Sequence, residues 1–401
     1  MISQQILQSL AQKGDQKMVL VVVDGLGGLP HRETGYSELE TANIPNLDRL
    51  AANGMTGLSI PVAQGITPGS GPGHLALFGY DPVSSNIGRG ALSALGIGLL
   101  LAPEDVAIRI NFCTVDSAGN VSDRRAGRIP TELNAELVRE LADIKIEGLT
   151  FDLATESQHR AVLVLRGRGM SPLVQETDPQ RTGVPPLPPD ALIPDAELTS
   201  EYLKEFLVKV TERIGACEPA NFIMMRGYAG LPDLKPISEL YSIRPACVAS
   251  YPMYKGLATA AGMTVLETGD TLDGQISTLR DNWKDFDYFF FHYKYTDSFG
   301  EDGDFDGKVG ALEEIDAAIP AILDLEPEAI VVAGDHSSPA MLSAHSWHPV
   351  PFALLAKSMF PDAVAKFTER ACAQGDLGTF PAQQTFSLML GYAGRLAKFG
   401  A

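Results

Sequence analysis

Cysteine, histidine and long apolar runs are all scarce in this chain of 401 residues. The four cysteines lie far apart and form no CxxC pair, so free thiols in a reducing cytoplasm are their simplest account. No apolar run approaches the roughly 18 residues that would suggest a membrane span. The N-terminal residues Ile2, Ile6, Leu7 and Leu10 have helical spacing without a basic start, which predicts a surface helix and not a signal peptide. We therefore expect a cytoplasmic protein that does not enter a membrane.

The chain also has few positively charged residues relative to its acidic ones. The 31 lysines and arginines are outnumbered by 50 aspartates and glutamates, which gives a formal net charge of −19. A protein this acidic repels phosphate backbones, so we expect no nucleic-acid partner. An anionic substrate would need a pocket built from local positive charge, supplied by arginines, lysines or metal ions. The sequence leaves a homo-oligomer open.

Short apolar runs bounded by turn residues indicate the fold class. Residues 18–24 are rich in valine, residues 286–297 are aromatic and apolar, and residues 328–336 form a third run. Near-continuous apolar runs of this length are typical of buried strands in a largely parallel sheet. Residues 43–54 and 308–325 have helical patterns. Strands that alternate with helices predict a doubly wound α/β domain.

The middle of the chain has a different character. It contains many of the arginines and the proline-rich stretch 182–195. We interpret residues 89–244 as a smaller inserted α/β (α+β) domain that binds substrate. The core domain is then discontinuous and consists of residues 1–88 and 245–401. No internal repeat is visible.

Acidic residues end all three apolar runs, at Asp24, Asp297 and Asp335. Ligands of open α/β sheets bind outside the carboxyl ends of the strands, so these side chains could converge on one site. An aspartate after a strand is often only a helix cap or a turn residue. Three such aspartates, with His336 directly after the last and His345 nine residues later, favour a divalent-metal site.

A glycine-rich segment, residues 65–82, supplies a candidate nucleophile. Ser70 lies between Gly69 and Gly71, and a helix predicted after it would offer backbone N–H groups to an anion. A serine is a poor nucleophile unless a base or a metal lowers its pKa. By itself the segment could equally be a plain turn with a bystander serine.

Six ordered segments together resemble the archaeal-type, cofactor-independent phosphoglycerate mutases of the alkaline phosphatase superfamily. The segments are VVVDGLGG, PGSGPGHLALFGYDP, DRRAGR, MYKGLA, YTDSFGEDGDFDGKV and AGDHSSP…HSWHPVP. The resemblance spans nearly the whole chain and implies an alkaline-phosphatase-like core. It also implies that 3-phosphoglycerate and 2-phosphoglycerate are interconverted through a phosphoserine at Ser70, without 2,3-bisphosphoglycerate.

The resemblance further implies two divalent metal ions. One would be held by Asp24, Ser70, Asp335 and His336, and the other by Asp297, Glu301 and His345. Broader members of the family have histidine where this chain has Glu301, and archaeal members have an acidic residue where it has Gly71. A carboxylate ligand favours manganese or magnesium over zinc, so manganese is our first expectation, with magnesium, cobalt and zinc left open.

Cationic side chains must bind the carboxylate and phosphate of the substrate, and the fork of arginine suits both groups. The candidates lie in or beside the family-like segments: Arg124, Arg128, Arg160, Arg226 and Lys255, with His348 as a neighbour of the metal site. We expect closure of the two domains to complete the site and exclude water.

Other functions remain open from the sequence alone. A related metal-dependent phosphatase or phosphotransferase could use the same metal core on another small phosphorylated metabolite. A metal-binding protein without catalytic activity is a third interpretation. Residues 302–313 also fit an EF-hand calcium loop, but we expect a strand and not a helix to precede them, which argues against calcium binding.

Overall fold

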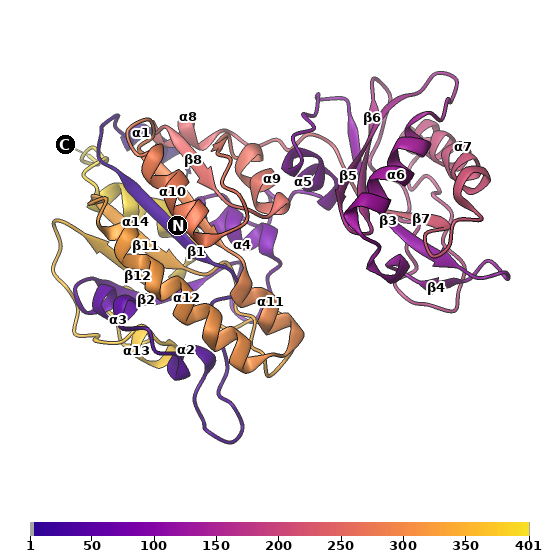
Figure 1. Cartoon of the computed structure of the whole chain (residues 1–401). Coiled ribbons are helices and arrows are strands. Elements are labelled where there is room, and N and C mark those ends of the chain that lie inside the picture. The colour runs from indigo at the N-terminus through magenta and orange to yellow at the C-terminus, as the bar shows by residue number, and fades with distance from the viewer. Residues whose placement is uncertain (1–3, 401) are drawn as a thin grey trace. The chain divides into compact units, whose positions relative to one another are not determined.

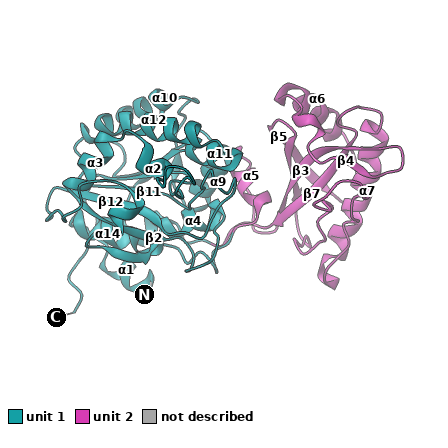
Figure 2. Cartoon of the chain, turned by 90° about the horizontal axis from the view of Figure 1, so that it is seen from below, with its two compact units in different colours: residues 1–86, 234–401 teal, residues 87–233 magenta. Residues whose placement is uncertain are grey.

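The computed structural model describes residues 4–400, which form two compact units. Unit 1 consists of residues 1–86 and 234–401, and unit 2 consists of residues 87–233 (Figure 2). The boundaries predicted from the sequence follow residues 88 and 244, whereas those of the structure follow residues 86 and 233. The second boundary differs more than the first. Residues 234–244 belong to unit 1 because helix α8 (Ile237–Tyr241) packs against helix α1 (Gln4–Leu10). The predicted N-terminal helix begins at Ile2, which lies outside the described residues.

Unit 1 is built on an eight-stranded sheet with the order β13-β2-β12-β11-β1-β10-β8-β9 (Figure 1). β12 pairs antiparallel with both of its neighbours, and every other pairing is parallel, so β12 alone runs against the rest. The predicted, largely parallel sheet is therefore confirmed. The strands are β1 (Met18–Val23), β2 (Met55–Ile60), β8 (Pro245–Val248), β9 (Thr264–Val265), β10 (Tyr288–Tyr293), β11 (Ala329–Ala333), β12 (Val350–Ala356) and β13 (Gly378–Pro381).

Helices cover both faces of this sheet. The remaining helices of unit 1 are α2 (Glu38–Thr41), α3 (Pro45–Ala52), α4 (Ser70–Leu77), α9 (Pro252–Ala260), α10 (Leu272–Asp281), α11 (Tyr295–Asp302), α12 (Phe305–Leu323), α13 (Glu369–Cys372), η3 (Ala382–Gln384) and α14 (Thr385–Tyr392). Val19, Val21 and Val23 of β1 share a core with apolar residues of α3, α10 and α12. On the opposite face, Phe290 contacts Phe78 directly after α4. Burial on both faces explains why β1 is apolar throughout rather than alternating.

Unit 2 is built on an antiparallel five-stranded sheet. Its strands are β3 (Val106–Val115), β4 (Val121–Asp123), β5 (Thr150–Ser157), β6 (Arg160–Arg166) and β7 (Phe222–Ala229), and β3 pairs with β4, β6 and β7. Its helices are α5 (Arg89–Gly96), η1 (Ala126–Arg128), α6 (Thr131–Ala142), η2 (Pro194–Ala196) and α7 (Glu197–Ile214). Ile108, Ile110 and Phe112 of β3 belong to a core shared with α6 and α7. The alternate residues of β3 therefore face the other way.

Two local predictions are wrong. The strand expected to end at Asp297 ends at Tyr293, and Asp297 lies in the first turn of α11. The strand expected before residues 302–313 is also wrong, because helix α11 precedes this segment. No twelve-residue loop follows, however, since Asp304 caps α12 by accepting a hydrogen bond from the Gly307 N–H group and the chain is helical from Phe305. Among the described residues, no helix combines the length and apolar character needed to cross a membrane.

Candidate active site

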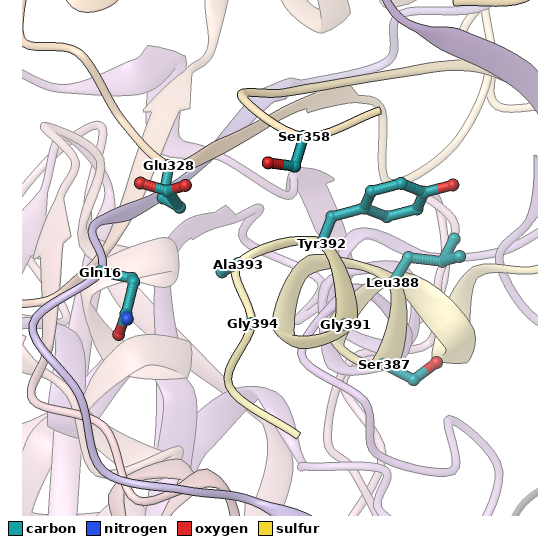
Figure 3. Close-up of a pocket in the computed structure, with 9 residues that line it drawn as sticks. All are labelled: Gln16, Glu328, Ser358, Ser387, Leu388, Gly391, Tyr392, Ala393 and Gly394. Atoms are coloured by element: carbon teal, nitrogen blue, oxygen red, sulfur yellow. The ribbon is translucent and has the colours of Figure 1, made fainter. Parts of the chain in front are cut away.

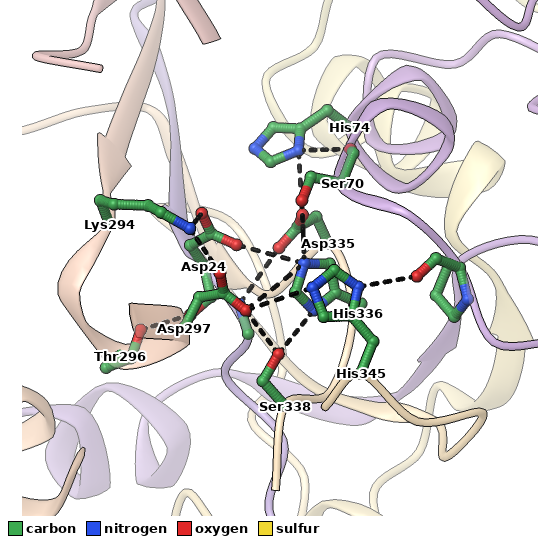
Figure 4. A network of polar contacts seen from close by, with 12 residues as sticks. Asp24, Ser70, His74, Lys294, Thr296, Asp297, Asp335, His336, Ser338 and His345 are labelled. Atoms are coloured by element: carbon green, nitrogen blue, oxygen red, sulfur yellow. Dashed lines mark hydrogen bonds and ion pairs between the residues drawn. The ribbon is translucent and has the colours of Figure 1, made fainter. Parts of the chain in front are cut away.

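Asp24, Asp335 and His336 lie at the carboxyl ends of two neighbouring strands of the unit 1 sheet. Asp24 follows β1, and Asp335 with His336 follows β11, the parallel neighbour of β1. On the other side of β1, the chain leaves β10 and reaches Asp297 within one helical turn. All four side chains are buried and point toward one another (Figure 4). The sheet order thus brings together residues more than 300 positions apart in the sequence.

Ser70 is the first residue of α4 and points its hydroxyl into this group. Its Oγ atom lies 3.2 Å from Nε2 of His336. The close approach depends on Gly73, since a Cβ atom there would lie 2.1 Å from the Asp335 carbonyl oxygen. The first N–H groups of an α-helix have no intrahelical acceptor and carry partial positive charge, so this end of α4 favours an anion.

One group of side chains that could hold a cation consists of Asp24, Asp335 and His336. Nε2 of His336 lies 3.3 Å from Asp24 Oδ1 and 3.2 Å from Asp335 Oδ2. Both oxygens are buried without a hydrogen-bond partner. Such atoms are costly unless they have a ligand, so their chemistry fits a divalent metal. On its other side, Nδ1 of His336 lies 3.1 Å from Ser338 Oγ, which fixes the ring.

A second group consists of Asp297, His336 and His345. Nδ1 of His345 lies 2.9 Å from the Pro68 carbonyl oxygen, so this nitrogen donates and Nε2 stays available as a ligand. Nε2 lies 3.5 Å from Asp297 Oδ1 and 3.4 Å from Glu301 Oε1. Glu301 is on α11, one turn after Asp297, and its side chain is 55% exposed. It therefore lies at the solvent side of this group.

Charge interactions within the site shift the pKa values of its members. Burial alone would raise the pKa of Asp24, but the charge of Lys294 and the imidazoles of His292 and His336 hold it well below its usual range. Burial opposes protonation of His345, yet the hydrogen bond with Glu301 and the charge of Asp297 raise its pKa to about 9. A hydrogen bond from His345 lowers the pKa of Glu301. Asp24 and Glu301 are thus held in the ionised form that binds cations.

Several residues of this site were missed from the sequence. Nδ1 of His74 lies 3.1 Å from Asp335 Oδ2, and although burial opposes protonation, the charge of Asp335 raises the pKa of His74. Lys294 contacts both Asp24 and Asp297. The Tyr254 hydroxyl donates to Asp24. The spacing could have revealed two of them: His74 lies one helical turn after Ser70, and Lys294 three residues before Asp297.

Lys308 joins the two loops that carry the first group. This fully buried lysine donates from Nζ to the carbonyl oxygens of Gly25 at 2.9 Å, Gly27 at 3.0 Å and Ser338 at 2.8 Å. The loops pass so closely that a Cβ atom at Gly25, which has a φ of +65°, would lie 2.9 Å from Ser338 Cβ. The segment resembling an EF-hand therefore supplies an internal cation rather than a calcium loop.

The arginines predicted to bind substrate belong to unit 2. Arg109 pairs opposite Arg226, and Arg160 pairs opposite Asn111, so the side chains of these residues share the sheet face that does not pack on α6 and α7. Arg124 donates two hydrogen bonds to the buried carboxylate of Asp178, at 3.0 and 2.8 Å. Arg226 binds the same carboxylate at 3.2 Å.

His159 lies among other arginines of unit 2, whose charges affect its pKa. Burial, and then the charges of the surrounding arginines, lower its pKa to about 4. These arginines are Arg160, Arg109, Arg125 and Arg128, in order of decreasing effect. Arg109 was missed from the sequence, although its position two residues before Asn111 on β3 places it on the arginine face. Several cationic side chains near an imidazole with a lowered pKa could bind an anionic group.

The remaining predicted residues and the surface pocket add less. Lys255 of α9 lies 4.0 Å from the exposed Glu267, and Nδ1 of His348 lies 2.9 Å from Ser346 Oγ. Neither belongs to the two candidate metal groups. A pocket of unit 1 is shown in Figure 3, and none of its lining residues is a predicted site residue. These are Gln16, Glu328, Ser358, Ser387, Leu388, Gly391, Tyr392, Ala393 and Gly394.

Comparison with known proteins adds independent information. A family model described as 2,3-bisphosphoglycerate-independent phosphoglycerate mutase matches residues 51–221. A relative from Thermus thermophilus, named a probable 2,3-bisphosphoglycerate-independent phosphoglycerate mutase, is 47% identical over 401 residues, or 99% of each chain. A relative of the same name from Aquifex aeolicus is 45% identical over 99% of this chain and 100% of its own length. A solved cofactor-independent phosphoglycerate mutase from Thermoplasma acidophilum has a TM-score of 0.72 and 28% identity over 94% of this chain and 100% of that chain.

Proposed function

Because the chain belongs to the family of 2,3-bisphosphoglycerate-independent phosphoglycerate mutases, we propose that it interconverts 3-phosphoglycerate and 2-phosphoglycerate through a phosphoserine at Ser70 with two divalent metal ions. It is an isomerase of this type, and the name of the family states that 2,3-bisphosphoglycerate is not required. The observation that carries the proposal is the position of Ser70 Oγ, 3.2 Å from His336 and beside two buried carboxylate oxygens that have no hydrogen-bond partner.

The residues divide into two ligand sets. Asp24, Ser70, Asp335 and His336 would hold one ion, and Asp297, Glu301 and His345 would hold the other. Bound ions would neutralise the charge that develops on the phosphoryl group and lower the pKa of the serine hydroxyl. Oxygen ligands outnumber imidazoles in both sets, which favours manganese or magnesium, with cobalt and zinc still open.

Ser70 is the acceptor and then the donor of the phosphoryl group. Its Oγ attacks phosphorus, the bond to the departing glycerate oxygen breaks, and the proton of the serine hydroxyl is lost in exchange for the proton that the glycerate hydroxyl gains. The other glycerate hydroxyl then attacks the phosphoserine and restores Ser70. The first N–H groups of α4 would face the anionic phosphoryl group, and the glycerate would have to stay bound between the two steps.

The cationic residues would bind the anionic ends of the substrate. Arg160 and Arg128, together with Arg109 and Arg125, place positive charge around His159. Arg226 and Arg124 are anchored by Asp178, which presets the direction of their guanidinium groups. Lys255 and His348 are further candidates from unit 1. Fork-shaped guanidinium groups suit both the carboxylate and the phosphate of phosphoglycerate.

An assay of the purified chain against each phosphoglycerate, coupled to enolase in the forward direction, tests this function. We expect turnover without added 2,3-bisphosphoglycerate and negligible release of inorganic phosphate. Release of phosphate as the main product would instead favour the related phosphatase. Loss of turnover in Ser70→Ala assigns the nucleophile, whereas retained turnover in that variant would contradict the phosphoserine.

A further inference from the structure

We propose that Lys294 is a built-in cation of the metal site, which binds one carboxylate from each ligand set and weakens the hold of the site on divalent ions. This inference rests on the proposed metal sites. It concerns a residue that belongs to neither ligand set. Its experimental consequences are opposite changes in the stability of the metal-free protein and in its affinity for metal.

The backbone places Lys294 between the two sets. It follows β10 directly and is the N-cap residue of α11, whose first turn carries Asp297. β10 pairs in parallel with β1, and Tyr293 lies opposite Val23, the residue before Asp24. The Asp24 N–H group donates to the Tyr293 carbonyl oxygen at 2.9 Å, which fixes this register. Lys294 is therefore the one-residue extension of β10 that faces both acids.

The contacts of Lys294 leave the metal-facing oxygens untouched. Nζ lies 3.1 Å from Asp24 Oδ2 and contacts Asp297 Oδ2 (Figure 4). The other oxygen of each carboxylate faces the histidines: Asp24 Oδ1 lies 3.3 Å from His336, and Asp297 Oδ1 lies 3.5 Å from His345. Each carboxylate is thus divided between the lysine and the position of an ion. Lys294 can keep both contacts while metal binds.

The surroundings hold Lys294 in its charged form. Its Nζ atom contacts one carboxylate oxygen of Asp24 and one of Asp297, and two adjacent carboxylates favour an ammonium group. The side chain is 18% exposed, and its ammonium group lies 5.8 Å from the ring centres of Tyr251 and Tyr254. Aromatic faces attract cations, so these two rings add to the attraction of the carboxylates.

A fixed positive charge at this position has two effects of opposite sign. Without divalent ions, it offsets the repulsion among buried carboxylates and so stabilises the metal-free fold. With ions present, the same charge repels them and competes for the same carboxylates, which lowers the affinity of the site for divalent ions. A lysine that served only to pack the fold would change stability alone, and one that bound only substrate would change KM alone.

The test compares Lys294→Met with Lys357→Met, which removes an exposed lysine paired with Glu328 in the same unit. Metal-free protein is prepared with a chelator, its thermal unfolding is measured, and Mn²⁺ binding is followed by calorimetry. We expect Lys294→Met to unfold at a lower temperature than the control and to bind Mn²⁺ about fivefold or more tightly than the unsubstituted chain. Lys294→Arg, which keeps the charge, should lie closer to the unsubstituted chain in both measurements.

Weaker or unchanged Mn²⁺ binding by Lys294→Met would overturn the inference, as would a metal-free protein as stable as the control. These outcomes are separate from failure of the proposed function. If the unsubstituted chain bound no Mn²⁺ and formed no phosphoserine, the proposed function would fail, while the stability comparison would still decide whether Lys294 offsets the acidic cluster.

Discussion

The two units carry polar clusters of opposite charge and different construction. Unit 1 gathers carboxylates and imidazoles at the ends of parallel strands, where backbone register and the internal Lys308 fix their positions. Unit 2 spreads arginines over one face of an antiparallel sheet and around His159. The first cluster fits cations and a nucleophile, and the second fits anions. The difference fits the proposed function, in which unit 1 would perform phosphoryl transfer and unit 2 would bind the substrate.

Removing the nucleophile should have the largest effect. Ser70→Ala deletes the proposed phosphoryl acceptor, so we expect turnover to fall by roughly 10³-fold or more, with binding of phosphoglycerate to unit 2 retained. The enolase-coupled assay measures turnover. Ser84→Ala, which changes an exposed serine of unit 1, should leave the rate unchanged.

Metal removal should have the second largest effect, and it should affect turnover in unit 1 but not substrate binding in unit 2. Treatment with a chelator should abolish turnover, and added Mn²⁺ should restore it, because the oxygen-rich ligand sets need a divalent ion. Binding of 3-phosphoglycerate at the arginines of unit 2 should survive in the chelated protein, as measured by calorimetry. Equal loss of both would show that the clusters are not independent.

Loss of the internal cation should destabilise unit 1. Lys308→Met leaves three buried carbonyl oxygens without their donor, and we expect the free energy of unfolding to fall by about 2–4 kcal/mol. Chemical denaturation measures this change. Lys357→Met is the matched control, since that lysine is about half exposed and makes one surface ion pair.

Substitutions in the arginine cluster should mainly weaken substrate binding. Arg160→Met or Arg128→Met should raise KM about tenfold, with a smaller change in kcat, because these side chains would bind the substrate in both ground and transition states. Arg168→Met, at a position 91% exposed, should change neither constant. A large fall in kcat at constant KM would place these arginines in the chemical step instead.

The smallest effect concerns the titration of His159. Its pKa is about 4 in the folded chain, against 6.5 for an ordinary histidine. The unfolded chain therefore binds more protons between these values, and His159 lowers stability as the pH falls from about 6.5 to 4. An anion bound among the arginines should offset their charge and raise the pKa of His159. Nuclear magnetic resonance of the imidazole, with and without 3-phosphoglycerate, would detect this shift, and an unchanged pKa would argue against binding there.

The sequence predicted the position of site residues that follow strands better than the position of site residues that lie in helices. Asp24, Asp335 and His336 follow apolar runs, so their convergence could be predicted from the rule for parallel sheets. Asp297 was predicted at a strand end although it lies in the first turn of a helix, because the aromatic run continues to Tyr295 without a turn signal. The structure nevertheless brings it to the same site.

Residues that neutralise or orient the site could not be found in this way. Lys308 lies in a segment whose acids resemble a calcium loop, and its partners are backbone oxygens that carry no sequence signal. The pairing of Arg124 and Arg226 with Asp178 depends on the antiparallel register of unit 2. Such contacts arise from tertiary packing, which short motifs do not encode.

The most direct test of the phosphoryl-transfer account is to trap the proposed intermediate. The Mn²⁺-loaded chain would be mixed with 3-phosphoglycerate, quenched in acid, digested and examined by mass spectrometry. We predict one phosphoryl group on the peptide that contains Ser70, and none on that peptide in Ser70→Ala. Rapid mutase turnover without any phosphorylated Ser70, under conditions that preserve a synthetic phosphoserine peptide, would contradict the account.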